Sequence, residues 1–227
     1  MILCGGMATR LYPITKKIPK SMILVNRKPF LEYQIELLKR NGIYDIVLCV
    51  GNRSTQIKKY FGNGNKFGVT LSYSADGKKL LGTAGAIKNA EELLENVFMV
   101  MYGDSYLPFD FQKAIKFFNK YNKKGLMTVY KNSGKYDKSN VVVSGDYVKI
   151  YSKTEKKKNM SYIDYGASIL RKDCLKLIPK EKIFDMSDVF QKLITQKELL
   201  AFDSKKRFYE IGSFAGLEEF KKYSKKL

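Results

Sequence analysis

The sequence predicts an α/β fold, in which a mostly parallel sheet is flanked by helices and continues into an α+β extension. Three observations lead to this prediction. Short apolar runs alternate with helical segments over the first 130 residues, the run at 97–102 (VFMVMY) is apolar at consecutive positions, and the pattern changes after Tyr130. A continuous apolar run is typical of a strand buried on both faces. Alternation of strands and helices is typical of a doubly wound fold.

The first half supplies the central elements of this sheet. A short strand at 2–4 ends at two glycines, and a helix at 30–41 places its apolar residues on one face before Gly42. Apolar runs and helical spacing predict the rest in the same way. The expected strands are 45–50, 69–74, 97–102 and 126–130. One expected helix starts at Ser54, and two others span 83–94 and 111–121.

Residues 131–227 have the pattern of an extension of this sheet. Two β-type runs, 141–143 and 147–151, are joined by Ser144-Gly145-Asp146 and predict a hairpin. The elements that follow are a strand at 162–170, a helix at 186–197 capped by Ser187, strands at 199–203 and 208–211, and a closing helix from Ser213. We therefore expect one domain over residues 1–227, made of a first half at 1–130 and a second half at 131–227.

The composition excludes several classes of site. The 227 residues include no His and only three widely spaced Cys, which excludes His-based triads, His-ligated metals, zinc ribbons and disulfide scaffolds. The net charge of +20 comes mostly from Lys spread along the chain, and this favours a solvated surface over nucleic-acid binding. No apolar run approaches ~18 residues, which predicts no membrane span. The N-terminus lacks the basic region, apolar core and cleavage site of a secretion signal, so we expect a cytoplasmic protein.

Three loops at the carboxyl ends of predicted strands carry the candidate chemistry. In Gly5–Leu11 (GGMATRL), small residues let backbone N–H groups approach an anion, and Arg10 adds a fixed cation. Lys20 offers a second cation further along. Asp104 follows the strand at 97–102, where a carboxylate can bind Mg²⁺. The third loop is 81–85 (LGTAG). Together these groups predict phosphoryl or nucleotidyl transfer, which needs no His.

These segments resemble the signature of the sugar-1-phosphate nucleotidylyltransferases. The resemblance runs from residue 2 to about residue 217 and rests on segments in the family's order: GGMATRL, Pro13, Pro19-Lys20, Lys28-Pro29, Gly82-Thr83-Ala84-Gly85-Ala86 and Gly103-Asp104. It implies a single GT-A-like (Rossmann-like) domain with a sugar-binding elaboration, in which residues 1–130 form a nucleotide-binding half and residues 131–227 a sugar-phosphate-binding half. It also implies that an NTP and a sugar 1-phosphate react to an NDP-sugar and pyrophosphate, by in-line attack with Mg²⁺ as cofactor.

The resemblance also assigns roles to individual residues. Arg10 would hold the β- and γ-phosphates, Lys20 would hold the α-phosphate and the sugar phosphate, and Asp104 would bind Mg²⁺. Glu210, where the family often has Asp, would be the second metal ligand. The remaining contacts would be Leu3, Gly5, Gly6, Thr9, Asp76, Gly82 and Thr83 for the nucleotide, and Lys153, Asp164 and Gly166 for the sugar phosphate.

Asp76 bears on the choice of nucleobase. The segment Tyr73–Asp76 resembles mannose- and heptose-1-phosphate guanylyltransferases, and the Asp76 carboxylate would accept from guanine N1–H and N2–H₂ or serve as a turn residue before Gly77. GTP is therefore favoured, with CTP, UTP and dTTP as alternatives. Besides Glu210, Ala8 and Asp164 also depart from the family's pattern: Ala8 replaces a glycine, which narrows the approach to phosphate, and Asp164 replaces an asparagine. The product would be a precursor of surface polysaccharides or glycoconjugates.

Two other hypotheses remain open at this level. A GT-A glycosyltransferase shares the sheet and a metal carboxylate, but it usually has Asp-x-Asp where this chain has Gly103-Asp104-Ser105. A catalytically weakened binding or regulatory subunit is favoured by Ala8 and Glu210, and opposed by the presence of all three predicted catalytic residues. The expected partners are the NTP and the sugar 1-phosphate, without nucleic acid or membrane, in a monomer or homo-oligomer.

Overall fold

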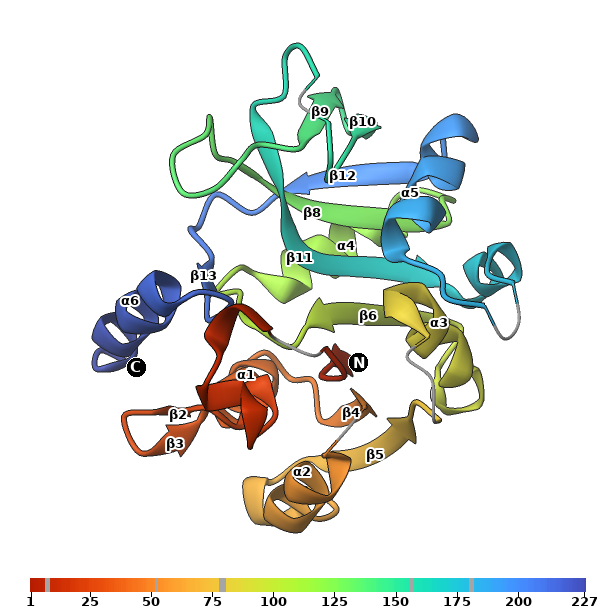
Figure 1. The fold of residues 1–227 in the computed structure, drawn as a ribbon. Helices are drawn as coiled ribbons and strands as arrows, with labels where there is room; N and C mark the ends of the chain where they lie inside the picture. The colour runs from red at the N-terminus through yellow and green to blue at the C-terminus, as the bar shows by residue number, and fades with distance from the viewer. Residues whose placement is uncertain (7–8, 52, 78–80, 156, 180–181) are drawn as a thin grey trace. The chain divides into compact units, whose positions relative to one another are not determined.

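The computed structural model describes residues 1–227 except 7–8, 52, 78–80, 156 and 180–181 (Figure 1). Its contacts divide the chain into two compact units, each discontinuous in sequence. The first unit comprises residues 1–80, 101–108 and 208–227, and the second comprises residues 81–100 and 109–207. The predicted halves, 1–130 and 131–227, each contain residues of both units, and their division by function remains a prediction.

Parallel strands form the sheet of the first unit. Strand β1 (Ile2–Leu3) pairs with β4 (Asp45–Val50) on one side and with the last residues of β6 (Val97–Tyr102) on the other. Strand β5 (Thr70–Ala75) continues the parallel order beyond β4, and the two lie side by side in Figure 1. Leu3 is in register with Cys49 and Tyr102, so the loops after these three strands leave from one edge of the sheet, as the sequence predicts.

The helices of the first unit are α1 (Phe30–Arg40), α2 (Ser54–Phe61) and α6 (Phe214–Ser224). Three 3₁₀ turns (Thr9–Leu11, Ile14–Lys16 and Lys20–Met22) and a small ribbon of β2 (Leu24–Val25) and β3 (Lys28–Pro29) connect β1 to α1. Aromatic rings join α6 to α1, since the Phe220 ring meets those of Phe30 and Tyr33 edge-on at 5.0 and 5.3 Å. This packing fixes α6, and with it the segment that leads into it.

The second unit contains a mixed sheet. Strand β8 (Gly125–Lys131) pairs antiparallel with β11 (Tyr162–Arg171) and parallel with β12 (Leu199–Asp203), and Figure 1 shows the three side by side. Strand β10 (Tyr147–Tyr151) pairs with β12 and forms the predicted hairpin with β9 (Val141–Ser144). The register of β11 shifts between Asp164 and Ser168, at a bulge where Gly166 has φ +101°.

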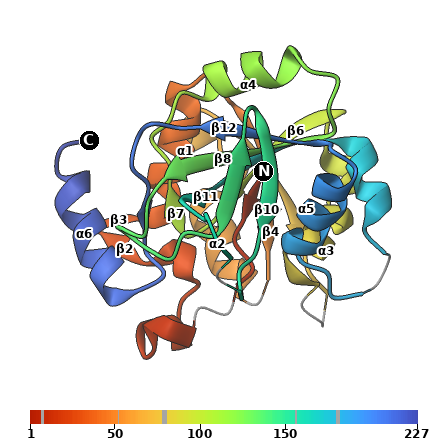
Figure 2. The ribbon, with the colours of Figure 1, turned by 90° about the horizontal axis from the view of Figure 1, so that it is seen from above.

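Three helices complete the second unit: α3 (Gly82–Asn89), α4 (Phe111–Asn119) and α5 (Met186–Thr195). Figure 2 shows α4 along β8 and β12, with α3 beside α5. None of the helices in the described ranges has the length and apolar character needed to cross a bilayer. The predicted α/β class is confirmed, with parallel strands in the first unit and mixed strands in the second.

Three details of the predicted elements are wrong. Helix 83–94 is α-helical only up to Asn89, since a 3₁₀ turn at Glu91–Leu93 follows before Leu94 becomes extended (φ −106°, ψ 138°) and leads into β6. The cap of α5 is Asp185 and not Ser187, since Asp185 and Asp188 form a reciprocal capping box. The strand at 208–211 is reduced to β13 (Tyr209–Glu210), which pairs antiparallel with the equally short β7 (Ser105–Tyr106).

Candidate active site

Lys20 and Asp104 form the centre of the candidate site in the first unit. Lys20 Nζ donates a hydrogen bond to Asp104 Oδ2 at 2.9 Å, and the two residues are 84 positions apart in the sequence. Both side chains are partly buried, with 16% of Lys20 and 32% of Asp104 exposed. Lys20 opens a 3₁₀ turn after Pro19, and Asp104 lies in the loop between β6 and β7. The structure therefore joins two of the three predicted catalytic residues directly.

The backbone that carries Asp104 is held by β1 and α1. The N–H of Gly103 donates to the Leu3 carbonyl at 3.0 Å, and a β-carbon at Gly103 would collide with that oxygen. Gln34, which is fully buried on α1, donates through Nε2 to the carbonyls of Tyr102 at 2.9 Å and Ser105 at 2.8 Å. These two carbonyls flank Asp104, so the carboxylate sits on a loop with little freedom. The sequence places Gln34 on the apolar face of its helix but does not reveal this role.

Arg10, Asp104 and Glu210 converge on Gly212. A β-carbon at Gly212 would lie 2.7 Å from Glu210 Oε2, 3.2 Å from Arg10 Nη2 and 3.6 Å from Asp104 Oδ2. The segment is anchored next to Asp104, because the N–H of Ile211 donates to the Asp104 carbonyl at 2.9 Å. The four charged residues that the sequence selects thus occupy one region, with two cations and two carboxylates.

The Glu210 carboxylate also supports the start of α6. Its Oε1 accepts from the Ser213 hydroxyl at 2.6 Å, and its Oε2 accepts from the Gly212 N–H. Ser213 in turn caps α6 by accepting from the Gly216 N–H at 3.0 Å. A carboxylate at a helix N-terminus is favoured by the helix dipole. Each Glu210 oxygen thus already has a donor, which a metal ion would have to share or displace.

The donor set suits Mg²⁺. This ion takes oxygen ligands, commonly one or two carboxylates, and completes its shell with waters and substrate phosphates. Asp104 and Glu210 supply two carboxylates close to the same point at Gly212. Within the described ranges, no group of three or more His, Cys, Asp or Glu could hold a metal ion. The residues therefore fit a metal that substrate phosphates help to hold, and not a closed protein cage.

A cavity of about 230 Å³ adjoins Lys20 in the first unit. It is lined by the end of β1, by the segment that follows and by the start of α2: Cys4, Gly5, Gly6, Tyr12, Thr15, Ile18, Pro19, Lys20 and Arg53. The predicted phosphate loop therefore borders a real cavity through Gly5 and Gly6. Residues 7–8, including Ala8, lie outside the described residues, and so does the side chain of Thr9.

Asp76 lies beside Gly5, where strands of the first unit end. The Asp76 N–H donates to the Val50 carbonyl at 2.9 Å, and a β-carbon at Gly5 would be 3.3 Å from Asp76 Oδ2. Burial raises the pKa of the Asp76 carboxyl. Leu3, another predicted nucleotide contact, is half-buried in β1. Asp76 is thus a partly desolvated acceptor next to a residue that lines the cavity.

The other two predicted nucleotide contacts, Gly82 and Thr83, lie in the second unit. Gly82 has φ +75°, and a β-carbon there would be 2.6 Å from the Phe184 carbonyl. The Thr83 hydroxyl donates to Asp185 Oδ1 at 3.2 Å and accepts from the Met186 N–H at 2.8 Å. Both residues therefore pack α3 onto the start of α5. Their contact with a nucleotide remains a prediction.

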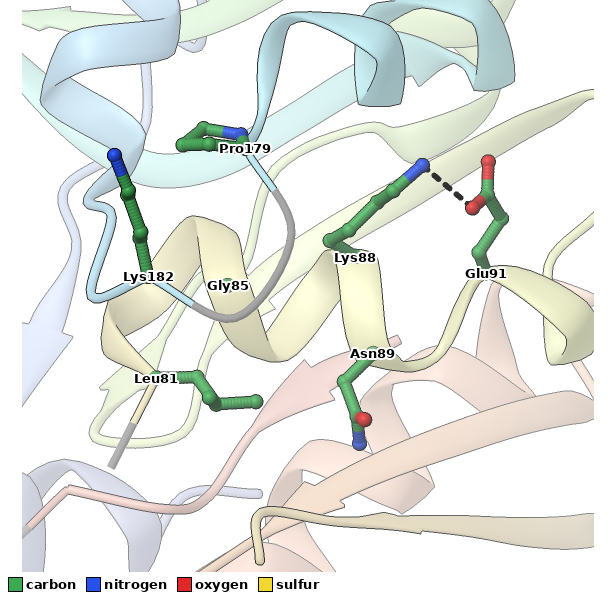
Figure 3. A pocket seen from close by; sticks show the side chains of 7 residues that line it. All are labelled: Leu81, Gly85, Lys88, Asn89, Glu91, Pro179 and Lys182. Carbon is green, nitrogen blue, oxygen red and sulfur yellow. Dashed lines mark hydrogen bonds and ion pairs between the residues drawn. The ribbon is translucent and has the colours of Figure 1, made fainter. Parts of the chain in front are cut away.

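A second cavity, of about 300 Å³, lies along α3 in the second unit (Figure 3). Lys88 Nζ pairs with Glu91 Oε2 at 2.6 Å at its edge, and Figure 3 shows Pro179 and Lys182 on a separate segment that also lines the cavity. None of the predicted site residues lines this cavity; its lining is Leu81, Gly85, Lys88, Asn89, Glu91, Pro179 and Lys182.

The predicted sugar-phosphate residues gather around the bulge of β11. The Asp164 carboxylate accepts from the Gly166 N–H at 3.0 Å and from the Tyr151 hydroxyl at 3.4 Å. Burial raises the pKa of Asp164 to about 6, although the Gly166 bond and the nearby Lys153 charge oppose the rise. Asp164 therefore gains or loses a proton within one to two pH units of neutrality.

Comparison with known proteins gives a consistent picture. A family model described as nucleotidyl transferase matches residues 1–226. A D-glycero-alpha-D-manno-heptose 1-phosphate guanylyltransferase of Campylobacter jejuni is 33% identical over 192 residues, which cover 84% of each chain. A UTP–glucose-1-phosphate uridylyltransferase of Synechocystis is 32% identical over 86% of this chain and 54% of its own. The crystal structure of HddC from Yersinia pseudotuberculosis with GMP-PN has a TM-score of 0.78 and 25% identity, covering 98% of this chain and 97% of its own.

Proposed function

The chain belongs to the nucleotidyl transferase family, and on that premise we propose that it is a sugar-1-phosphate nucleotidylyltransferase that uses GTP and Mg²⁺. The observation that supports this most is the convergence of Arg10, Lys20, Asp104 and Glu210 in one unit, next to a cavity lined by Gly5 and Gly6. Two relatives of more than 30% identity are named for transfer to heptose 1-phosphate and to glucose 1-phosphate.

The proposed chemistry depends on charge stabilisation. An oxygen of the sugar phosphate attacks the α-phosphorus of the NTP, the new P–O bond forms, and pyrophosphate leaves with the electron pair of the broken bond. A phosphate monoester is largely ionised at neutral pH, so the nucleophile needs no general base. This agrees with a chain that has no His. Lys20 would neutralise the attacking and α-phosphates, and Arg10 the leaving pyrophosphate.

Mg²⁺ would stabilise the charge on the phosphate oxygens. Asp104 would hold the ion, because its carboxylate stands on the braced loop after β6. Glu210 would assist directly by giving up a bond from Gly212 or Ser213, or indirectly through water.

Asp76 supports the choice of GTP. A carboxylate can accept from guanine N1–H and N2–H₂ together, whereas cytosine and uracil lack this pair of neighbouring donors. Asp76 lies beside Gly5, which lines the cavity near Lys20. The GMP-PN in the HddC complex and the guanylyltransferase among the relatives also favour guanine. CTP, UTP and dTTP are the alternatives.

The acceptor is proposed to be a sugar 1-phosphate, contacted by Lys153, Asp164 and Gly166 of the second unit. The product would serve the synthesis of surface polysaccharides or glycoconjugates in the cytoplasm. A pyrophosphate-release assay tests the proposal, with GTP, CTP, UTP and dTTP against a panel of sugar 1-phosphates. We expect turnover with GTP that stops when EDTA removes the metal. Absence of release with every pair, or release unaffected by EDTA, would contradict it.

A further inference from the structure

Arg53 lies at the start of α2 in a backbone conformation that arginine rarely adopts. Its φ of +67° and ψ of 22° fall in the left-handed region, which favours glycine and asparagine. Its guanidinium contacts the 3₁₀ turn after β1: Nη1 donates to the Thr15 carbonyl at 3.0 Å and Nη2 to the Lys16 carbonyl at 2.5 Å. From the same helix, Gln56 Nε2 donates to the Lys17 carbonyl at 2.9 Å. We refer to these three bonds as the Arg53–Gln56 clasp.

The clasp continues the bonding of the 3₁₀ turn from outside it. Within the turn, the Lys16 N–H donates to the Pro13 carbonyl at 3.1 Å, and the Lys17 N–H donates to the Ile14 carbonyl at 3.5 Å. The clasp bonds the next three carbonyls, those of Thr15, Lys16 and Lys17, in sequence order. Five consecutive carbonyls from Pro13 to Lys17 therefore accept a hydrogen bond, three of them from side chains of Arg53 and Gln56.

The segment that the clasp fixes leads directly to Lys20. Only Ile18 and Pro19 separate Lys17 from Lys20, and the Pro19 ring restricts the backbone there to a φ of −60°. Pro19, Lys20 and Arg53 line the same cavity, and Lys20 Nζ bonds Asp104. We infer that Arg53, with Gln56, is a positioning residue that holds segment 13–20 and thereby keeps Lys20 against Asp104. The catalytic consequence of this inference rests on the proposed function.

An arginine suits this task better than other residues. Its planar guanidinium presents two donors to two neighbouring carbonyls at once, whereas a lysine ammonium is a flexible point charge. The competing assignment for Arg53 is direct contact with substrate phosphates, because it also borders the cavity. The two assignments differ in the protein without substrate: only the positioning role requires segment 13–20 to loosen when the guanidinium is removed.

The test uses the full chain without substrates. Arg53→Gly removes the guanidinium and accepts the positive φ, Arg53→Lys keeps the charge, and Gln56→Ala removes the third bond. Lys59→Ala is the matched control, since it removes an exposed cation from the same helix. Hydrogen exchange by mass spectrometry reports on the backbone amides of segment 13–20, except at Pro13 and Pro19, which have none. Acylation of the Lys20 amine reports on its contact with Asp104. In Arg53→Gly we expect about tenfold faster exchange in that segment and severalfold faster acylation of Lys20.

The amides of β4 and β5 should keep their exchange rates in every variant. In segment 13–20, Lys59→Ala should exchange at the rate of the wild type, and Arg53→Lys at a rate between those of the wild type and Arg53→Gly. In the pyrophosphate assay we expect Arg53→Gly to lower kcat about tenfold or more, with a smaller change in the KM for the NTP.

Unchanged exchange and acylation in Arg53→Gly would overturn the positioning role. A raised KM with unchanged exchange would assign Arg53 to direct phosphate contact, and faster exchange without loss of kcat would separate the clasp from catalysis. Exchange and acylation need no turnover, so an inactive wild type would refute the proposed function while these two measurements still decide whether the clasp holds Lys20.

Discussion

Lys20 donates from Nζ to Asp104 Oδ2 at 2.9 Å, and this bond links the turn after Pro19 to the loop after β6. In the proposed reaction the two partners have different roles, because Asp104 would bind the metal and Lys20 would bind phosphate. Loss of either should therefore affect turnover far more than folding.

We predict that Asp104→Ala abolishes Mg²⁺-dependent pyrophosphate release and that Lys20→Ala lowers kcat by roughly 10²–10³, the effect typical of removing one charge-stabilising group. Folding should change by about 1 kcal/mol or less, since partly exposed ion pairs contribute little. Lys88→Ala is a matched control: it breaks the Lys88–Glu91 pair, whose side chains are 18% and 32% exposed, against 16% and 32% for Lys20 and Asp104. Initial rates of the three variants measure turnover, and thermal melts measure folding. Unchanged turnover in both Asp104→Ala and Lys20→Ala would refute the mechanism.

Gln34 should prove to be a positioning residue. Gln34→Met keeps a side chain of similar length and removes the two bonds to the Tyr102 and Ser105 carbonyls. We expect a loss of about 1–3 kcal/mol in the free energy of unfolding, the cost of leaving buried acceptors without a donor, together with a fall in kcat. Asn41→Ala serves as the control, since it removes the bond from the residue that follows α1 to the Leu37 carbonyl, which does not flank Asp104. A variant with lowered stability but full kcat would show that Gln34 supports the fold alone.

The sequence is sufficient to predict that the main candidate residues lie together, because parallel strands determine where the loops that carry them begin. Once 2–4 and 97–102 are recognised as neighbouring parallel strands, the loops that carry Arg10 and Asp104 must meet at one edge. Segment 209–213 is harder, because its position depends on the two-residue pairing of β13 with β7 and on the aromatic packing of α6. Neither contact has a periodic pattern in the sequence.

The residues that the sequence does not reveal act through long-range backbone bonds. Arg53 is 38 positions from Thr15, and its role depends on a positive φ. An arginine in the sequence does not predict such a backbone conformation. Gln34 gives a weak signal, since a glutamine on an apolar helix face must find a buried partner. Gly82 shows the opposite difficulty: a glycine is equally suited to a ligand turn and to close packing, and here it packs against the Phe184 carbonyl.

Asp76 should control the choice of base. Asp76→Ala removes an acceptor for guanine N1–H and N2–H₂, so we expect kcat/KM for GTP to fall about tenfold to a hundredfold, with smaller changes for CTP and UTP. ITP makes the test sharper, because it lacks the N2 amino group. The wild type should prefer GTP to ITP, and the variant should lose that preference. An equal fall for all nucleotides would mean that Asp76 only supports the turn before Gly77.

Asp164 should make stability depend on pH. Burial raises its pKa from 3.8 to about 6, so between these values the folded chain holds a proton that the unfolded chain has lost. The contribution of Asp164 to stability therefore decreases as the pH rises from about 4 to 6, and it stays low above that range. Asp164→Asn removes this dependence. From pH 4.5 to 7.5 we expect the variant to gain roughly 2 kcal/mol relative to the wild type.

Urea unfolding at several pH values measures this difference. Asp173→Asn, at an exposed position in the same unit, controls for the loss of one negative charge. Parallel pH curves for the wild type and Asp164→Asn would contradict the shifted pKa.

Gly212→Ala offers a test of the convergence itself. Because the φ of Gly212 lies outside the left-handed region, an alanine adds a methyl group without backbone strain, and that methyl meets Glu210, Arg10 and Asp104 at 2.7, 3.2 and 3.6 Å. We expect kcat to fall at least tenfold, the size of effect that a small displacement of catalytic groups produces, while the chain stays folded. Gly77→Ala is the matched control in the same unit, since none of the residues that the structure describes lies within 4 Å of its β-carbon position and its φ is not positive. It should be neutral or slightly stabilising. If Gly212→Ala keeps full turnover and its usual melting temperature, the three charged groups do not act together at this point, and the proposed arrangement of metal and pyrophosphate around Gly212 is wrong.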